Sequence, residues 1–171
     1  AHGYVGGSAG AELTAANNVA AFDRWRIVPR FLRDVSERDP STEVLGIPLT
    51  APVALAPIGV LEIVHPEAER AVARACAATG TAMVLSSAAS NTMEDVAADL
   101  GDAPGLFQLY WPKSRDIAAS FVSRAERAGY RAILVTLDTT ILAWRPRDLQ
   151  TAYLPFLEGK GVANYFSDPA F

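Results

Sequence analysis

Four short apolar runs at nearly regular intervals constrain the fold of this 171-residue chain more than any other feature. They span residues 52–57, 81–86, 105–110 and 131–137, so their starts are 29, 24 and 26 residues apart. Each run is mostly continuous rather than alternating in polarity, which is typical of strands buried on both faces of a parallel sheet. We therefore predict a strand over each run.

Helical patterns fill the intervals between the runs. Apolar residues recur on one face over residues 66–79, 92–100 and 115–128. Asn91 suits the N-cap of the second of these helices, and Gly80 suits the end of the first. Strands that alternate with helices in this way predict repeated βα units.

Two fold classes use such units: the open doubly wound sheet and the (β/α)8 barrel. A dinucleotide-binding sheet requires a glycine-rich turn after its first strand, but here the chain reads Pro57-Ile58-Gly59-Val60. Polar residues instead occur at the ends of successive runs, and in a barrel these ends meet at one mouth, where active sites lie. The sequence therefore favours an α/β fold of the TIM-barrel type.

The length allows only part of such a barrel. A complete barrel takes about 250 residues, and four βα units make half of one. We predict that residues 51–171 form the first half of a (β/α)8 barrel as one truncated domain. Residues 1–50 are predicted to form an N-terminal cap, with a helix over residues 11–22 and an irregular cover or short strands after it.

Composition excludes several other classes of protein. The net charge of −4, with 15 scattered lysines and arginines, gives no basic patch for a nucleic acid or a membrane surface. No apolar run reaches the roughly 18 residues that span a bilayer. The single cysteine, Cys76, excludes an internal disulfide and fits the reducing cytoplasm. No histidine or cysteine spacing indicates a metal site, and acidic pairs such as Glu67/Glu69 suggest solvated helix faces.

Eight stretches, in their order and spacing, are similar to one known family. The chain resembles the FMN-dependent α-hydroxy acid oxidases and dehydrogenases, which have a (β/α)8 fold. Its residues 144–149 and 155–157 are most similar to the lactate 2-monooxygenase branch, and Ala88 replaces the tryptophan of glycolate oxidase-like members. The eight stretches are Asn18–Phe22, Pro29–Asp34, Ser41–Gly46, Leu55–Gly59, Leu85–Ala88, Phe107–Tyr110, Arg124–Tyr130 and Val135–Thr139.

The resemblance implies an FMN-dependent oxidoreductase that acts on a small L-2-hydroxy acid with O2. The branch implies that L-lactate is converted to acetate, CO2 and water. One alternative is an oxidase of L-lactate or another 2-hydroxy acid that releases the 2-oxo acid and H2O2. Another is a half-barrel that binds or pairs without catalysis.

The resemblance also implies roles for individual residues. Those toward the cofactor run along the flavin ring or hydrogen-bond its pyrimidine side, and they are Pro57, Ile58, Gly59, Ser86, Gln108 and Thr136. Those toward the reaction are Tyr4 and Tyr110, which face the substrate, Arg145, which holds its carboxylate, and Asp138, which orients a catalytic histidine.

That catalytic histidine has no match among His2 and His65, the two histidines of the chain. In the family the histidine, a lysine beside the flavin and the phosphate-binding loops follow later strands. We therefore expect the chain to be an N-terminal fragment of a cytoplasmic homo-oligomer, a tetramer or an octamer. The isolated fragment is expected neither to oxidise lactate nor to hold FMN tightly.

Overall fold

The computed structural model describes residues 1–171, which divide into two compact units. One unit combines Ala1–Asp39 with Ile141–Leu154, and the other combines Pro40–Thr140 with Pro155–Phe171. The chain thus leaves the second unit after Thr140 and returns to it at Pro155. No helix in the chain is both long enough and apolar enough to cross a membrane.

A four-stranded parallel sheet organises the second unit, in the order β3-β4-β5-β6. The strands are β3 (Ala54–Leu55), β4 (Ala82–Ser86), β5 (Gly105–Tyr110) and β6 (Ile133–Thr136). Each lies within one of the four apolar runs, so the predicted strands and their parallel arrangement are confirmed. Sheet order follows chain order, as successive βα units of a barrel require.

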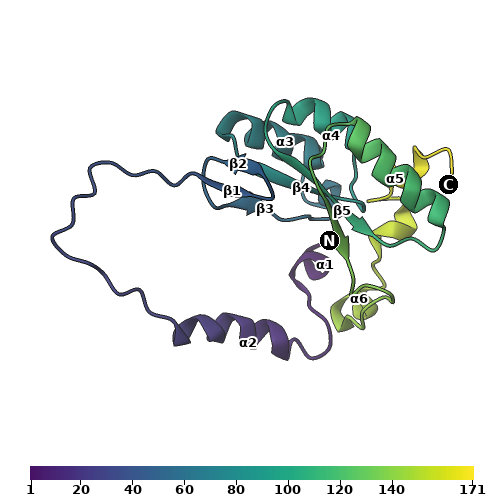
Figure 1. The fold of residues 1–171 in the computed structure, drawn as a ribbon. Helices are drawn as coiled ribbons and strands as arrows, with labels where there is room; N and C mark the ends of the chain where they lie inside the picture. Colours follow the sequence, from purple (N-terminus) through teal and green to yellow (C-terminus); the bar gives the residue numbers. More distant parts are fainter. The chain divides into compact units, whose positions relative to one another are not determined.

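Three helices cover one face of this sheet (Figure 1). They are α3 (Ala68–Thr79), α4 (Met93–Leu100) and α5 (Arg115–Arg127). α3 ends at Gly80, which has a φ of 65° and accepts the left-handed conformation at no steric cost. All three helices agree with the predicted ranges to within two residues.

The predicted N-cap of α4 is wrong by one residue. Thr92, with an extended backbone, is the cap, and its Oγ1 accepts a hydrogen bond from Asp95 N at 3.2 Å. Asn91 instead donates its backbone N–H to the Glu69 carboxylate at 3.2 Å. Since Asn and Thr are both good caps, this tertiary contact decides between two neighbouring candidates.

The apolar core lies between the sheet and the helices. Phe107 of β5 packs edge-on against Phe121 of α5, with ring centroids 6.2 Å apart, and both side chains are fully buried. Tyr130 is also buried, and its hydroxyl donates to Met93 O at 2.9 Å. These contacts fix the strands against the helices and so hold the carboxyl ends of β4 and β5 in place.

A hairpin precedes the sheet within the second unit. β1 (Thr42–Val44) pairs antiparallel with β2 (Ile47–Leu49). Leu45 and Gly46 form its two-residue loop, with φ angles of 54° and 74°. Two positive φ angles are the requirement of the tight turn that matches strand twist. Of the irregular cover or short strands expected after the helix within residues 1–50, short strands are therefore present here.

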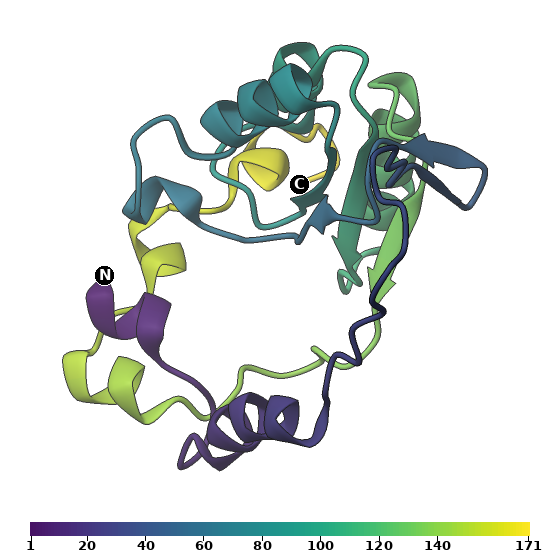
Figure 2. The ribbon, with the colours of Figure 1, turned by 90° about the vertical axis from the view of Figure 1, so that its left-hand side faces the viewer.

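The first unit is mostly helical where it has regular structure. It contains α1 (His2–Gly6), α2 (Leu13–Ala21), the 3-10 helix η1 (Phe22–Arg24) and α6 (Pro146–Thr151). Between η1 and the end of this unit's N-terminal part at Asp39 the chain forms no helix or strand (Figure 2). The predicted helix over residues 11–22 is confirmed.

Candidate functional site

A continuous hydrogen-bonded line of polar side chains crosses the carboxyl ends of β4, β5 and β6. Ser86 Oγ donates to Gln108 Oε1 at 3.0 Å, and Gln108 Nε2 donates to Thr136 Oγ1 at 2.7 Å. Ser86 and Gln108 are paired in the register of β4 and β5. The structure thus brings together three of the six residues that were predicted to contact a cofactor.

The direction of the hydrogen bonds along Ser86, Gln108 and Thr136 leaves N–H and O–H donors available at the β6 end. Gln108 Oε1 also accepts from Ser87 N at 3.3 Å, so the amide oxygen faces β4 and its nitrogen faces β6. Gln108 Nε2 therefore keeps a second N–H, and Thr136, which accepts from Gln108, keeps its own hydroxyl hydrogen. Two donors side by side suit a ligand that presents adjacent carbonyl or ring-nitrogen acceptors.

The loop after β3 closely approaches the loop after β4. A Cβ at Gly59 would lie 3.2 Å from both the Cβ and the carbonyl oxygen of Ala88. The next residue, Val60, is buried with a φ of 57°, and its N–H donates to Ala88 O at 2.9 Å. Pro57 and Ile58 are exposed just before this contact. A side chain at position 59 would therefore be tightly packed against Ala88, and glycine avoids that contact.

Tyr110 and Asp138 lie at the same strand ends in the second unit. Tyr110 ends β5, is half-buried, and its backbone N–H donates to Ser87 Oγ at 3.1 Å. Asp138 follows β6, is exposed, and accepts from Thr139 Oγ1 at 3.3 Å. An exposed carboxylate two residues beyond a strand is available to a partner group from elsewhere.

Tyr4 and Arg145 meet in the first unit. The Arg145 guanidinium lies over the Tyr4 ring, 4.7 Å from its centroid, and Nη2 donates to the carbonyls of Tyr4 and Gly7. Nε forms an ion pair with Asp148 at 3.1 Å. The structure therefore places two of the predicted substrate-contacting residues together, and it places Tyr110 and Asp138 in the second unit.

Glu69 lies beside the site, and the prediction that it belongs to a solvated helix face is wrong. Its side chain is buried rather than solvated, and its carboxylate accepts from Ser90 N at 3.1 Å and Asn91 N at 3.2 Å. Burial raises the pKa of Glu69, and the backbone donors only partly offset that effect. Glu69 thus holds the loop after β4 from the side of α3.

Fold and site together define the first half of a parallel βα barrel with polar residues gathered at its strand ends. A sequence profile described as FMN-dependent dehydrogenase matches residues 1–170. The chain belongs to this family, whose members are FMN-dependent oxidoreductases.

Curated relatives and solved structures agree with that assignment. An L-lactate oxidase of Lysinibacillus sphaericus is 40% identical over 169 residues, which are 99% of this chain and 44% of that protein. Glycolate oxidase of Spinacia oleracea is 42% identical over 158 residues, which are 90% of this chain and 42% of that protein. The chain spans less than half the length of these relatives.

Among solved structures, a mandelate oxidase variant with (S)-mandelic acid matches with a TM-score of 0.88 at 32% identity. That match covers 95% of this chain and 48% of the other. A lactate oxidase of Pediococcus acidilactici matches with a TM-score of 0.85 at 33% identity, over 92% of this chain and 46% of the other. These matches confirm the predicted half of a TIM-barrel fold.

The residues present fit the ring of the family's cofactor, FMN. The two remaining donors of Gln108 and Thr136 match the polar acceptors along one edge of an isoalloxazine. Gly59 packs against Ala88 on one side, and Pro57 and Ile58 before it are exposed. A flat ring can therefore approach the backbone of residues 57–59 from the exposed side.

Proposed function

We propose that this chain supplies the flavin-ring contacts and part of the substrate pocket of an FMN-dependent enzyme that oxidises a small L-2-hydroxy acid. The observation that carries the proposal is the line from Ser86 through Gln108 to Thr136, which ends in two uncommitted donors. Bound FMN supplies a two-electron acceptor for the hydroxy acid. The chain's own residues bind and orient the two partners.

Each remaining site residue has a proposed role in binding or orientation. The Arg145 guanidinium attracts the substrate carboxylate. Tyr4 and Tyr110 are each proposed to contact the substrate. Asp138 accepts a hydrogen bond from a histidine of the rest of the protein and stabilises that histidine's cation, as an orienting aspartate does elsewhere. The substrate loses its Cα hydrogen and its hydroxyl proton, and two electrons leave with them.

For the outcome of the reaction we favour L-lactate and O2 as substrates and acetate, CO2 and water as products. The stretches at residues 144–149 and 155–157 support this lactate 2-monooxygenase outcome. A second candidate is an oxidase that releases pyruvate and H2O2, which the relatives named L-lactate oxidase support. Quantifying acetate against pyruvate and peroxide after L-lactate turnover by the whole protein separates the two.

The family's phosphate-binding loops follow later strands than those of this chain. We therefore propose that the isolated chain binds the flavin ring and that the FMN phosphate adds nothing to its affinity. In a titration followed by fluorescence quenching, riboflavin and FMN should therefore bind the isolated chain with dissociation constants that agree within about twofold. An FMN affinity more than ten times that of riboflavin contradicts this proposal. Oxygen uptake with L-lactate by the isolated chain contradicts the proposal that it is inactive.

Variants test whether the line of polar side chains is the ring site. Gln108→Leu and Thr136→Val should each weaken riboflavin binding about three- to tenfold, the effect of one lost hydrogen bond. Thr42→Val, on the exposed hairpin strand β1, is the matched control and should change nothing. Flavin that causes no shift in the NMR signals of Ser86, Gln108 and Thr136 supports a non-catalytic half-barrel instead.

We also propose that the whole protein is a cytoplasmic homo-oligomer, a tetramer or an octamer. The buried free thiol of Cys76 supports a reducing compartment. Cell fractionation and the mass of the whole protein in solution test these two statements separately.

A further inference from the structure

The C-terminal segment, residues 155–171, packs against the loop that follows β4. It contains the 3-10 helix η3 (Pro155–Glu158) and the short helix α7 (Ala163–Phe166), and both belong to the unit of the sheet. Ala163 N donates to Ala89 O at 3.2 Å, and Gly161 N donates to Glu62 Oε1 at 3.1 Å. In Figure 2 the yellow C-terminal segment accordingly lies beside the teal part of the ribbon.

Asn164 lies on α7 and bonds both α4 and the loop after β4. Its side chain is fully buried. Oδ1 accepts from Met93 N, at the start of α4, at 2.8 Å, and Nδ2 donates to Ser87 O at 3.4 Å. A buried amide must have such partners, because an unpaired polar group in the core costs about 1–3 kcal/mol.

Ser87 connects Asn164 to the strand-end site. The Ser87 hydroxyl accepts from Tyr110 N at 3.1 Å, and the Ser87 N–H donates to Gln108 O at 2.9 Å and to Gln108 Oε1 at 3.3 Å. Ser87 thus bonds Asn164 of α7 through its carbonyl, and it bonds the two site residues of β5 through its N–H and its hydroxyl.

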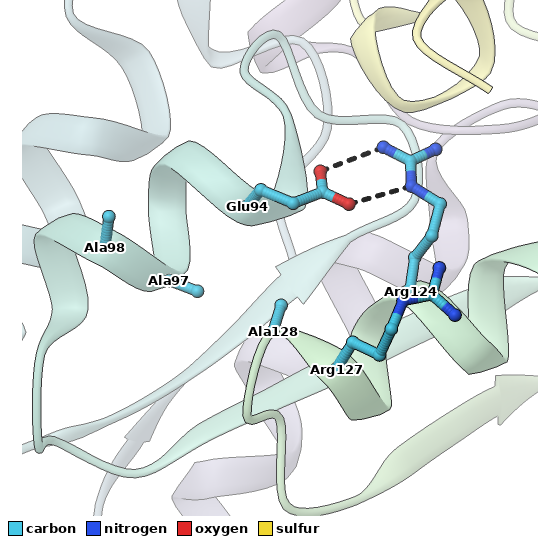
Figure 3. Close-up of a pocket in the computed structure, with 6 residues that line it drawn as sticks. All are labelled: Glu94, Ala97, Ala98, Arg124, Arg127 and Ala128. Carbon is cyan, nitrogen blue, oxygen red and sulfur yellow. Dashed lines mark hydrogen bonds and ion pairs between the residues drawn. The ribbon is translucent and has the colours of Figure 1, made fainter.

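A buried arginine anchors α7 in this position. Arg124 Nη1 donates to Asn164 O at 2.8 Å and to Asp168 Oδ2 at 3.0 Å. Its Nη2 donates to Ser167 Oγ at 2.9 Å and to Glu94 Oε2 at 2.9 Å. Figure 3 shows the guanidinium of Arg124 facing the carboxylate of Glu94. The segment is therefore held against α5.

We propose that Asn164 is a positioning residue, which sets the placement of Tyr110 and Gln108 through Ser87. This inference rests on the proposed function, because it assigns a purpose to the site that those residues form. Asn164 touches neither cofactor nor substrate in this proposal. The bond to Met93 N supports α4, and the bond to Ser87 O supports the site.

Two substitutions of Asn164 distinguish its hydrogen bond with Met93 N from its hydrogen bond with Ser87 O. Asn164→Asp keeps an acceptor for Met93 N but sets a carboxylate oxygen against the Ser87 carbonyl. Asn164→Ser keeps a shorter acceptor and does not reach Ser87, so it serves if the aspartate variant fails to fold. Ser167→Ala is the matched control, because it removes hydrogen bonds with Arg124 and with the Asn164 carbonyl but leaves the Asn164 side chain and Ser87 in place.

Two measurements on the full 171-residue chain test the proposal. In NMR spectra, the backbone amide of Tyr110 and the side-chain amide of Gln108 should shift in the Asn164 variants and not in Ser167→Ala. The riboflavin dissociation constant should rise about three- to tenfold in the Asn164 variants, the factor that corresponds to one hydrogen bond, and by less than twofold in the control.

A structural role alone gives a different result. The urea midpoint then falls in the Asn164 variants while the Tyr110 and Gln108 signals of the folded protein stay in place, and this outcome overturns the proposal. If the unaltered chain binds no riboflavin, the proposed function fails, but the two amide signals still report whether Asn164 positions the strand ends.

Discussion

Replacing Arg124 with methionine is the sharpest test of what holds the sheet unit together. All five N–H donors of the guanidinium are occupied, by Glu94, Asn164 O, Asp168 and Ser167. The Arg124 side chain is 8% exposed and that of Asp168 is 0% exposed. Methionine keeps the apolar length of the side chain and removes only the charged group.

The expected loss of unfolding free energy depends on which carboxylate is left buried without a counter-ion. Asp168 keeps bonds from Ser120 Oγ at 2.7 Å and Ala170 N at 2.9 Å but loses its counter-ion in a buried place. Removing one partner of a buried ion pair costs about 3–5 kcal/mol. Glu94 is half exposed, so its own bond contributes about 1 kcal/mol at most. We therefore expect Arg124→Met to lower the free energy of unfolding by about 3–5 kcal/mol.

Urea unfolding followed by circular dichroism at pH 7 measures this loss. Arg127→Met, one turn along the same helix and exposed, is the control and should cost less than about 0.5 kcal/mol. The double variant Arg124→Met with Asp168→Asn removes the stranded charge and should be more stable than the sum of the single effects by about 1–2 kcal/mol. Equal losses for Arg124→Met and Arg127→Met, or strict additivity, would refute the reasoning.

The same ion pairs set the acid limb of stability. The hydrogen bond from Arg124 holds the pKa of Glu94 below its usual range. Burial opposes ionisation of Asp168, but hydrogen bonds from Ala170 N, Ser120 and Arg124 outweigh it and lower the pKa. A carboxyl with a lowered folded pKa stabilises the fold above its unfolded pKa of about 4 and loses that contribution as the pH falls. Arg124→Met should therefore flatten the loss of stability below about pH 4.

Three further outcomes are expected. Gly161→Ala should destabilise the fold more than Gly46→Ala. Both glycines have positive φ, but only at Gly161 would a Cβ meet Val60 Cγ2, at 2.6 Å. The urea midpoints of the two variants measure the difference. Cys76 is buried and its thiol pKa is raised by desolvation, so a thiol reagent should label it only after denaturation, and fast labelling of the native protein would contradict this. Arg145→Lys should speed amide exchange in α1 about threefold or more, because a single ammonium group cannot replace both Nη2, which donates to the Tyr4 and Gly7 carbonyls, and Nε, which pairs with Asp148.

Local pattern was sufficient to predict the sheet and its covering helices. A short continuous apolar run and an apolar stripe with a period of 3.6 residues are both visible without knowledge of the partner element. Gly80 ended α3 as expected, because a positive φ is a local demand. The polar strand ends Ser86, Gln108 and Thr136 were found by their positions in the runs.

Contacts between distant parts of the chain were not predictable in this way. Arg124 and Asp168 are 44 positions apart, and Asn164 and Ser87 are 77 apart. No local period reports such pairs. Glu69 was predicted to lie on a solvated helix face as part of the acidic pair Glu67/Glu69, but its carboxylate bonds the loop after β4. An acidic residue on the apolar face of a helix was the only signal, and it requires a known partner to be interpreted.

The bonds of Arg145 add a constraint on how a carboxylate can bind there. Both N–H groups of Nη2 are directed at the carbonyls of Tyr4 and Gly7, and Nε is paired with Asp148. A carboxylate held by two parallel N–H bonds needs either Nη1 with Nη2 or Nε with Nη2. Since Nη2 takes part in both arrangements, a forked contact with Arg145 requires the backbone of residues 4–7 to release it. A contact through Nη1 alone leaves that backbone in place, so amide exchange in α1 on addition of a small carboxylate distinguishes the two modes.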